Sequence, residues 1–286
     1  QPRPPTPFEP AGRRPERPRV IMAEITAATV KALREATGQG MMECKKALQE
    51  TGGDMDAAKD LLRKKGLVTA EKKASRATSE GLIAISINDA ATQAAMVEVQ
   101  CETDFCARND VFRSMVKAVA DMAAAQEADG EVGATDAISE AVQDALAKIG
   151  ENMSYSRGVK MSAPRIGTYI HHNNKVGVLL GVDGEVDDET LSGLCMHVAF
   201  TDPIALTADE VPSELVEKER EIAHGQAIEA GKPPEIADKM VEGKIRKFMA
   251  ENALIEQPYV RDEKQAVKEV LGSAKITGFV RFAVGA

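Results

Sequence analysis

Residues 99–110, with the sequence VQCETDFCARND, decide the fold because they join a strand to a helix. Val97, Val99 and Cys101 alternate with polar residues, which predicts a strand with one buried face. An apolar stripe at helical spacing then predicts a helix from about residue 109. The polar turn between strand and helix carries Phe105, one of only seven phenylalanines in a chain without tryptophan. The position of this scarce aromatic side chain therefore needs an explanation of its own.

Two interpretations of Phe105 are open. In the first, Phe105 folds back under the helix as a local apolar clamp. A hydrophobic staple requires the residue directly before the N-cap, and an N-cap at Asn109 or Asp110 gives that place to Arg108 or Asn109. In the second, Asp104 and Phe105 form an exposed tip on a rigid strand–helix scaffold, as is typical of recognition loops.

The pattern around this stretch occurs twice along the chain. Segments 81–89 and 91–102 alternate in hydrophobicity and predict a β-hairpin before the helix. Segments 166–172 and 175–184 predict a second hairpin across Asn173-Asn174, followed by a helix at about 187–200. Two similar subdomains follow from this repetition, each an antiparallel sheet with a helix. Further elements are expected as a helix near 136–148, a strand in 153–163, a helix at 263–272 and a last strand at 275–284.

Helical segments flank and interrupt these subdomains. Residues 26–77 predict a module of three short helices, with breaks at TGQG (37–40) and TGG (51–53) and a polar helix or linker after Gly66. Residues 213–252 predict a charged helical hairpin that is broken at GKPPE (231–235). Its expected apolar stripe consists of Leu215, Ile222, Ile236, Met240, Ile245 and Phe248.

Composition narrows the function classes. The net charge is −9, and residues 1–21 contribute five arginines against two glutamates, so the rest of the chain carries −12. This acidic balance argues against direct nucleic-acid binding. No apolar run approaches the roughly 20 residues of a membrane span. We interpret residues 1–21 as a disordered Pro/Arg-rich extension, or as translated sequence upstream of a true start at Met22.

No motif indicates catalysis, a metal or a cofactor. The cysteines at 44, 101, 106 and 195 lack zinc-ligand spacing, and they fit reduced, buried residues of a cytoplasmic protein. His171 and His172 are adjacent on a predicted strand and point to opposite faces. We found no nucleophile elbow, zinc-protease or P-loop signature in the sequence. The chain is therefore predicted to act by binding rather than by chemistry of its own.

Two further stretches have alternative interpretations. Met41 and Met42 directly follow a glycine break, and they either line a broad apolar face of the small bundle or are exposed for a partner. His197 lies within the apolar stripe of a predicted helix. A core histidine is the more common explanation for such a position, and an exposed contact histidine is the alternative.

Five motifs in order carry a resemblance to a known family. They are TGQGMMECKKAL (37–48), TDF (103–105), MHVA (196–199), GKPPEIADKMVEGKIRKF (231–248) and TGFVRFAVG (277–285). Together they resemble the bacterial elongation factor Ts family over about residues 22–284. The family carries an aliphatic residue at the position of Cys106. Many members continue into a C-terminal helical module beyond the point where this sequence stops at Ala286, so we expect weaker contact with the partner here.

The resemblance implies an α+β fold and a function. The fold would combine a three-helix module similar to ubiquitin-associated domains, two sheet-plus-helix core subdomains and an inserted helical hairpin. The function would be guanine nucleotide exchange on elongation factor Tu, in which the tip dislodges Mg²⁺ and opens the nucleotide site. The implied site residues are Thr103, Asp104, Phe105 and Cys106 at the tip, with Met41, Met42 and His197 as further contacts with the GTPase.

The expected domain organisation follows from the pattern and the resemblance together. It consists of an extension (1–21), the helical module and linker (22–77), a core N-subdomain (78–150), the first part of a core C-subdomain (151–212), the helical hairpin (213–252) and the rest of the C-subdomain (253–286). Three roles of the hairpin stay open: it mediates a homodimer, it binds the partner, or it does neither. The competing function hypotheses are a peptide-binding adaptor that uses residues 26–66 and an enzyme that uses Cys101 or Cys106.

Overall fold

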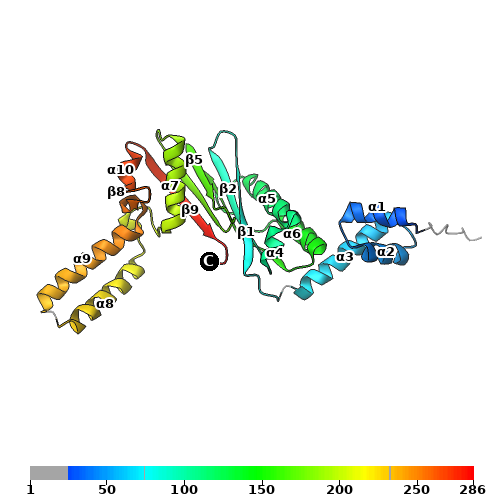
Figure 1. Ribbon diagram of the computed structural model, residues 1–286, viewed down its shortest axis with the longest axis horizontal. Coiled ribbons are helices and arrows are strands. Elements are labelled where there is room, and N and C mark those ends of the chain that lie inside the picture. The colour runs from blue at the N-terminus through cyan, green and yellow to red at the C-terminus, as the bar shows by residue number, and fades with distance from the viewer. Residues whose placement is uncertain (1–24, 74, 232) are drawn as a thin grey trace, which may run out of the picture. The chain divides into compact units, whose positions relative to one another are not determined.

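The computed structural model describes residues 25–73, 75–231 and 233–286. The predicted extension at 1–21 lies outside these residues. The chain divides into two compact units, Gln1–Lys65 and Gly66–Ala286. The α+β fold class with an N-terminal helical region is confirmed (Figure 1).

The first unit is built from helices with short breaks. Helix α1 spans Ala27–Thr37, α2 spans Met41–Glu50, and α3 starts at Met55 and runs to Lys73, beyond the expected break at Gly66. Thr26 caps α1 through a reciprocal capping box with Thr29, and Gly38 ends it in the left-handed region at φ 68°. The helices pack on a small core that consists of Val30, Leu33, Cys44, Ala47, Leu48, Ala58 and Leu62.

The first sheet of the second unit combines strands from both expected core subdomains, because its strand β4 lies in the segment 151–212 that was assigned to the C-subdomain. Strands β1 (Glu80–Ile87), β2 (Gln93–Cys101), β4 (Met153–Ser162) and β3 (Gly130–Glu131) are antiparallel in the order β1-β2-β4-β3. Helices α5 (Asp110–Ala124) and α6 (Asp136–Ile149) lie on one side of this sheet (Figure 1). Phe112 on α5 has no exposed surface and is the largest side chain in the core between these layers.

The second sheet combines a hairpin with the end of the chain. Strands β5 (Arg165–Ile170), β6 (Val176–Asp183) and β9 (Lys275–Ala283) are antiparallel in that order, and α7 (Asp188–Thr201) packs on β5 and β6. The two sheets meet through an apolar cluster that includes Ile83, Met96 and Leu179. At Gly177 a Cβ atom would lie 2.6 Å from Ile83 Cγ2, so this close approach requires glycine.

One predicted helix is shorter than expected. The segment 263–272 starts as part of strand β8 (Asp262–Ala266), which pairs with β7 (Pro258–Tyr259), and only Val267–Leu271 forms helix α10. The carboxylate of Glu269 accepts a hydrogen bond from the Ala266 amide at 2.9 Å and starts the helix there. Two short 3₁₀ turns complete the unit, Ala208–Glu210 and Leu254–Glu256.

The predicted helical hairpin is confirmed, but of its expected apolar stripe only Ile245 is buried. Helices α8 (Ser213–Glu229) and α9 (Pro234–Asn252) pack against each other. The buried residues are Ala223, Ala227, Ala237, Val241 and Ile245, whereas Leu215, Ile222, Ile236 and Met240 are exposed. Small alanine side chains let the two helices approach closely, and the larger apolar residues lie outside this contact.

Among the described residues, no helix is both long enough and apolar enough to cross a membrane.

Candidate functional site

The tip between β2 and α5 is a one-turn helix rather than the predicted irregular turn. Helix α4 spans Asp104–Arg108, and Thr103 is its N-cap. The Thr103 hydroxyl oxygen accepts a hydrogen bond from the Cys106 amide at 3.1 Å, which satisfies one of the free amides of the first turn. Asn109 then caps α5 by accepting from the Val111 amide at 2.8 Å. Two successive caps therefore fix where each helix begins.

Phe105 lies on the exposed side of α4. Its side chain is 79% exposed, whereas Cys106 and Ala107, the next two residues, are buried in the core of the first sheet. The Asp104 carboxylate is 3.0 Å from the Arg108 guanidinium, and both side chains are substantially exposed. The local clamp interpretation of Phe105 is therefore wrong in this conformation. The tip presents an aromatic ring and a carboxylate to solvent.

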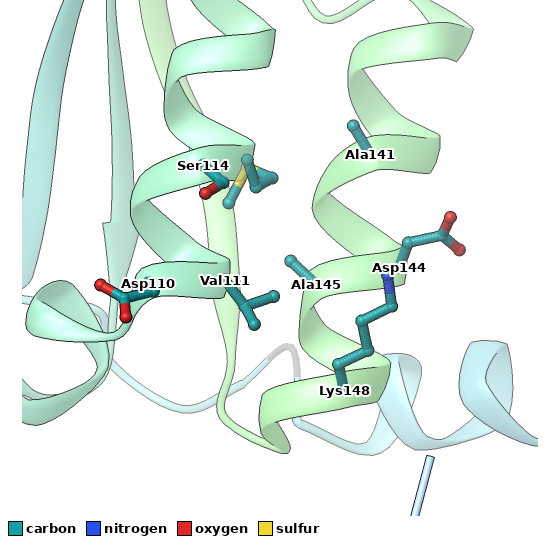
Figure 2. Close-up of a pocket in the computed structure, with 8 residues that line it drawn as sticks. Asp110, Val111, Ser114, Ala141, Asp144, Ala145 and Lys148 are labelled. Carbon is teal, nitrogen blue, oxygen red and sulfur yellow. The ribbon is translucent and has the colours of Figure 1, made fainter. Parts of the chain in front are cut away.

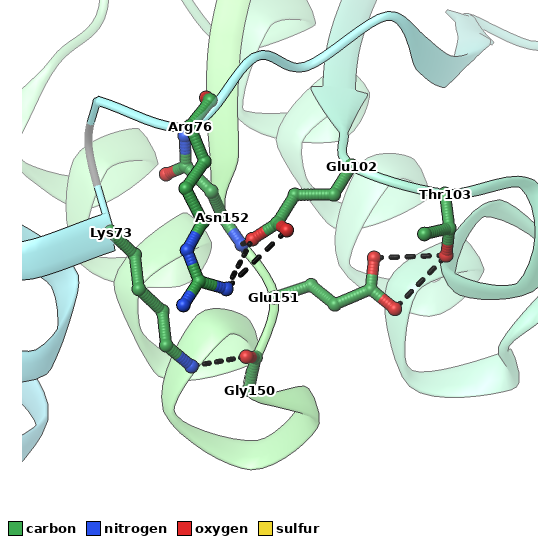
Figure 3. Close-up of polar contacts among 7 residues, drawn as sticks. All are labelled: Lys73, Arg76, Glu102, Thr103, Gly150, Glu151 and Asn152. Carbon is green, nitrogen blue, oxygen red and sulfur yellow. Dashed lines mark hydrogen bonds and ion pairs between the residues drawn. The ribbon is translucent and has the colours of Figure 1, made fainter.

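The tip is attached to the connection between α6 and β4 (Figure 3). The Thr103 hydroxyl donates to the Glu151 carboxylate, at 2.9 Å from Oε2 and 3.0 Å from Oε1. One residue earlier, Glu102 accepts from the Asn152 backbone amide at 2.5 Å and pairs with Arg76 at 3.3 Å. The hydrogen bond from the Asn152 amide is the main cause that lowers the pKa of Glu102, and the nearby Arg76 adds to it.

The segment that precedes β1 joins the same network. The side-chain amide of Asn152 donates to the Arg76 carbonyl at 2.8 Å, and Lys73 donates to the Gly150 carbonyl. Gly150 ends α6 in the left-handed region at φ 86°, where glycine carries no Cβ penalty. Three parts of the chain that are distant in sequence, Lys73 with Arg76, residues 102–103 and residues 150–152, therefore meet next to the start of α4.

The thiols of Cys106 and Cys195 are held in their neutral form. The neighbouring Cys101 thiol, with burial, raises the pKa of the Cys106 thiol, and burial raises the pKa of Cys195 to about 12. The thiolate is the nucleophilic form, so these thiols remain unreactive at neutral pH. All four cysteines are free and buried. The side chain of Cys106 faces the core and supports the tip from below.

A groove runs beside the tip between α5 and α6 (Figure 2). It has a volume of about 500 Å³ and is lined by Asp110, Val111, Ser114, Met115, Ala141, Asp144, Ala145 and Lys148. Val111, in the first turn of α5, is 42% exposed and extends the apolar surface near the tip. The groove gathers aliphatic side chains with charges among them, and no group of three metal-ligating side chains occurs within the described part of the chain.

The predicted methionine contacts are exposed in the first unit. Met41 and Met42 begin α2 and are 49% and 64% exposed, whereas Cys44 and Leu48 point into the bundle. The interpretation in which both methionines line the bundle core therefore does not hold. Gly40 is the N-cap, so no side chain caps the first turn of α2.

His197 is a core residue, which corrects its prediction as a surface contact. Its side chain has no exposed surface, its Nε2 lies 2.9 Å from Gln257 Oε1, and its Nδ1 accepts from the Val260 amide at 3.2 Å. Burial lowers the pKa of His197 below its ordinary value of 6.5, although the bond to Gln257 opposes that shift. The ring is therefore neutral and connects α7 to the segment that follows α9.

The buried neutral state of His197 predicts a pH dependence of stability. Below about pH 6.5 the unfolded chain binds a proton at this ring that the folded protein does not bind, so stability falls as pH falls. The slope contributed approaches about 1.4 kcal/mol per pH unit. We expect His197→Gln to lack this contribution when the free energy of unfolding is measured in urea between about pH 5.5 and 7.5. Equal pH slopes in both proteins would show that the ring titrates normally.

Sequence reasoning missed the residues that hold the tip. Glu151 bonds Thr103 across 48 positions, and Asn152 bonds Glu102 across 50 positions. The only local signal is a glycine that ends a predicted helix, followed by two polar residues before a strand. Such a signal indicates a turn, and it cannot reveal which distant group the turn contacts.

Comparisons with known proteins identify the family of this chain. The family model described as elongation factor TS matches residues 102–286. Among curated relatives named elongation factor Ts, that of Thioalkalivibrio sulfidiphilus is 44% identical over 276 residues, which cover 91% of this chain and 92% of the relative. That of Bartonella bacilliformis is 45% identical over 289 residues, with 91% and 93% covered. That of Methylococcus capsulatus is 44% identical over 272 residues, with 91% and 92% covered. The chain therefore belongs to the elongation factor Ts family.

Proposed function

We propose that this protein binds the GDP-bound form of elongation factor Tu and promotes the release of GDP. Membership of the elongation factor Ts family makes the chain a translation elongation factor. The observation that carries the finer proposal is the exposure of Phe105, 79%, on a helix that is capped, bonded and anchored in the core. An apolar ring held outward in water is suited to burial in a partner.

The proposed mechanism requires no covalent step. A GTPase holds GDP through the backbone amides of its P-loop and through Mg²⁺, which contacts the phosphates. Phe105 would enter the partner beside the nucleotide site and stabilise a conformation that holds Mg²⁺ and phosphate poorly. Asp104, directly before it, would bring a carboxylate to the same place. The protein would thus act by preferential binding to an open state, without catalytic chemistry of its own.

The other proposed contacts divide into direct and supporting roles. Met41 and Met42 are exposed and unbranched, which suits an adaptable contact with the GTPase. Thr103 and Cys106 fix α4 from beneath, and their side chains point toward the protein itself. His197 would act only through the fold of α7, because its ring is buried.

Binding and nucleotide release are thermodynamically linked. If the protein weakens GDP binding by a given factor, GDP weakens binding of the protein by the same factor. GTP would then rebind to the partner and displace the protein.

The proposed displacement of Mg²⁺ predicts that a chelator reduces the acceleration of GDP release. In buffer with Mg²⁺, the protein should accelerate release of fluorescently labelled GDP from elongation factor Tu. In EDTA the metal is already gone, so the remaining acceleration should be smaller, by about tenfold or more if displacement of Mg²⁺ is a main effect. Stopped-flow fluorescence measures both rates. Equal acceleration in the two buffers would contradict a role in displacing Mg²⁺, while leaving nucleotide exchange itself in place.

A further inference from the structure

The hydroxyl of Thr103 bonds two groups in opposite roles, because it accepts from the Cys106 amide and donates to the Glu151 carboxylate. Its oxygen accepts from the Cys106 amide at 3.1 Å, and its proton is directed at the Glu151 carboxylate, 2.9 Å from Oε2 (Figure 3). A threonine hydroxyl has one proton and two lone pairs, and it rotates to suit its neighbours. When the hydroxyl proton points at the carboxylate in a hydrogen bond, a lone pair of the Thr103 oxygen faces the Cys106 amide. Glu151 therefore sets the orientation of the Thr103 hydroxyl that caps α4.

The carboxylate also strengthens the cap. Hydrogen bonds to an ionised acceptor are about twice as strong as neutral ones. Donation to the carboxylate polarises the hydroxyl, which makes its oxygen a better acceptor for the Cys106 amide. Glu151 follows Gly150 at the end of α6, and its neighbour Asn152 donates to Glu102 at 2.5 Å. Glu151 and Asn152, which are consecutive in the turn after α6, therefore bond Thr103 and Glu102, the two residues directly before α4.

Helix α4 depends on these contacts for its orientation. It has five residues, too few to be stable by itself in water. Phe105 adds nothing to the core because it is exposed, so the direction of its ring is set by the cap and by the buried residues Cys106 and Ala107. Functional groups lose efficiency when their supporting contacts leave them misplaced by about 1 Å.

We infer that Glu151 is a positioning residue of the tip: it orients the Thr103 hydroxyl so that α4 presents Phe105 in one direction. This inference rests on the proposed exchange function, since it assigns Glu151 a part in that activity. It differs from general support of the fold, because it predicts that Glu151 and Thr103 act as a unit.

A double-mutant cycle tests the pair. The variants are Thr103→Val, which keeps the shape and removes the hydroxyl, Glu151→Ala, and both together. Release of labelled GDP from elongation factor Tu is measured over a range of protein concentrations. Each single variant should lower the maximal release rate by about tenfold, since one charge-assisted hydrogen bond is worth about one tenfold step. The double variant should be no slower than the slower single variant.

The concentration dependence separates positioning from general damage. A partly unfolded variant has fewer active molecules, so it needs more protein for half-saturation but reaches the same maximal rate. A misdirected tip lowers the maximal rate itself. Thr103→Ser retains the hydroxyl and should remain close to wild type. Glu127→Ala removes an exposed carboxylate from the same subdomain and should leave both quantities unchanged.

A second measurement does not depend on the partner. Hydrogen exchange of the Cys106 amide should become about tenfold faster in Glu151→Ala, because the cap that protects this amide is weakened. Unchanged protection, unchanged maximal rates in the single variants, or effects that multiply in the double variant would each overturn the inference. If the wild-type protein failed to accelerate release while Cys106 protection still depended on Glu151, the proposed function would be wrong and the structural link between Glu151 and the cap would stand.

Discussion

Replacing Phe105 with alanine is expected to lower the maximal rate of GDP release from elongation factor Tu by about tenfold to a hundredfold. Full burial of a phenylalanine side chain contributes about 1.5–3 kcal/mol, which corresponds to that range of rates. The ring is 79% exposed in the free protein, so its removal leaves the core untouched. We therefore expect the variant to fold normally and still to bind the partner through its other contacts. Stopped-flow release of labelled GDP measures the rate, and gel filtration or calorimetry measures the complex.

Phe200 offers a matched control for Phe105. It is also a phenylalanine on the surface, 78% exposed, but it lies at the end of α7 and not at the tip. Phe200→Ala removes an equivalent ring and is expected to keep the maximal release rate. If Phe105→Ala releases GDP as fast as wild type while the complex persists, the tip is not the part of the protein that opens the nucleotide site.

The second large effect concerns stability. Glu98 on β2 has no exposed surface, and its carboxylate binds Arg157 at 2.8 Å, Gln100 at 2.8 Å and the Gly285 amide at 3.1 Å. Arg157 on β4 also donates to the Ala283 carbonyl at 2.9 Å. This pair therefore joins the first sheet to the end of β9 in the second sheet. We expect Arg157→Met to lower the free energy of unfolding by about 3 kcal/mol, because it leaves a buried carboxylate without its cation.

Methionine is chosen because it retains the apolar stem. The Arg157 guanidinium lies over the Phe282 ring, 4.4 Å from the ring centroid, and this contact is lost in the variant together with the ion pair. An exposed ion pair on α5, Lys117 with Asp121 at 3.7 Å, provides the control. Lys117→Met is expected to change stability by less than about 0.5 kcal/mol. Urea denaturation followed by circular dichroism measures both variants, and equal losses would show that the buried Glu98 carboxylate does not depend on Arg157.

Local chemistry explains which parts of the fold could be predicted. Cap residues and apolar periodicity are properties of neighbouring residues, so the helices of the first unit and both β-hairpins agree with the sequence analysis. Cap geometry also argued against a staple at Phe105, which agrees with its exposure. The exposed start of α2, with Met41 and Met42, was one of two interpretations, and only the packing of the bundle decided between them.

Contacts between distant residues explain what could not be predicted. Periodicity favours large apolar residues as the buried stripe, but the α8–α9 hairpin buries Ala223 and Ala227 instead, and Ile222 is exposed. His197 lies in an apolar stripe under either interpretation, and its burial depends on Gln257, 60 positions away. The link from Thr103 to Glu151 spans 48 positions in the same way. The exposed residues of the candidate site were therefore easier to predict than the residues that support them.

The central claim is that this protein promotes GDP release from elongation factor Tu, and the release rate tests it most directly. Elongation factor Tu loaded with labelled GDP is mixed with excess unlabelled GDP, with and without increasing concentrations of the wild-type protein. The proposed function predicts a release rate that rises with protein concentration and saturates at a value on the order of a hundredfold or more above the spontaneous rate. A release rate that stays at the spontaneous value while the two proteins form a complex would contradict it.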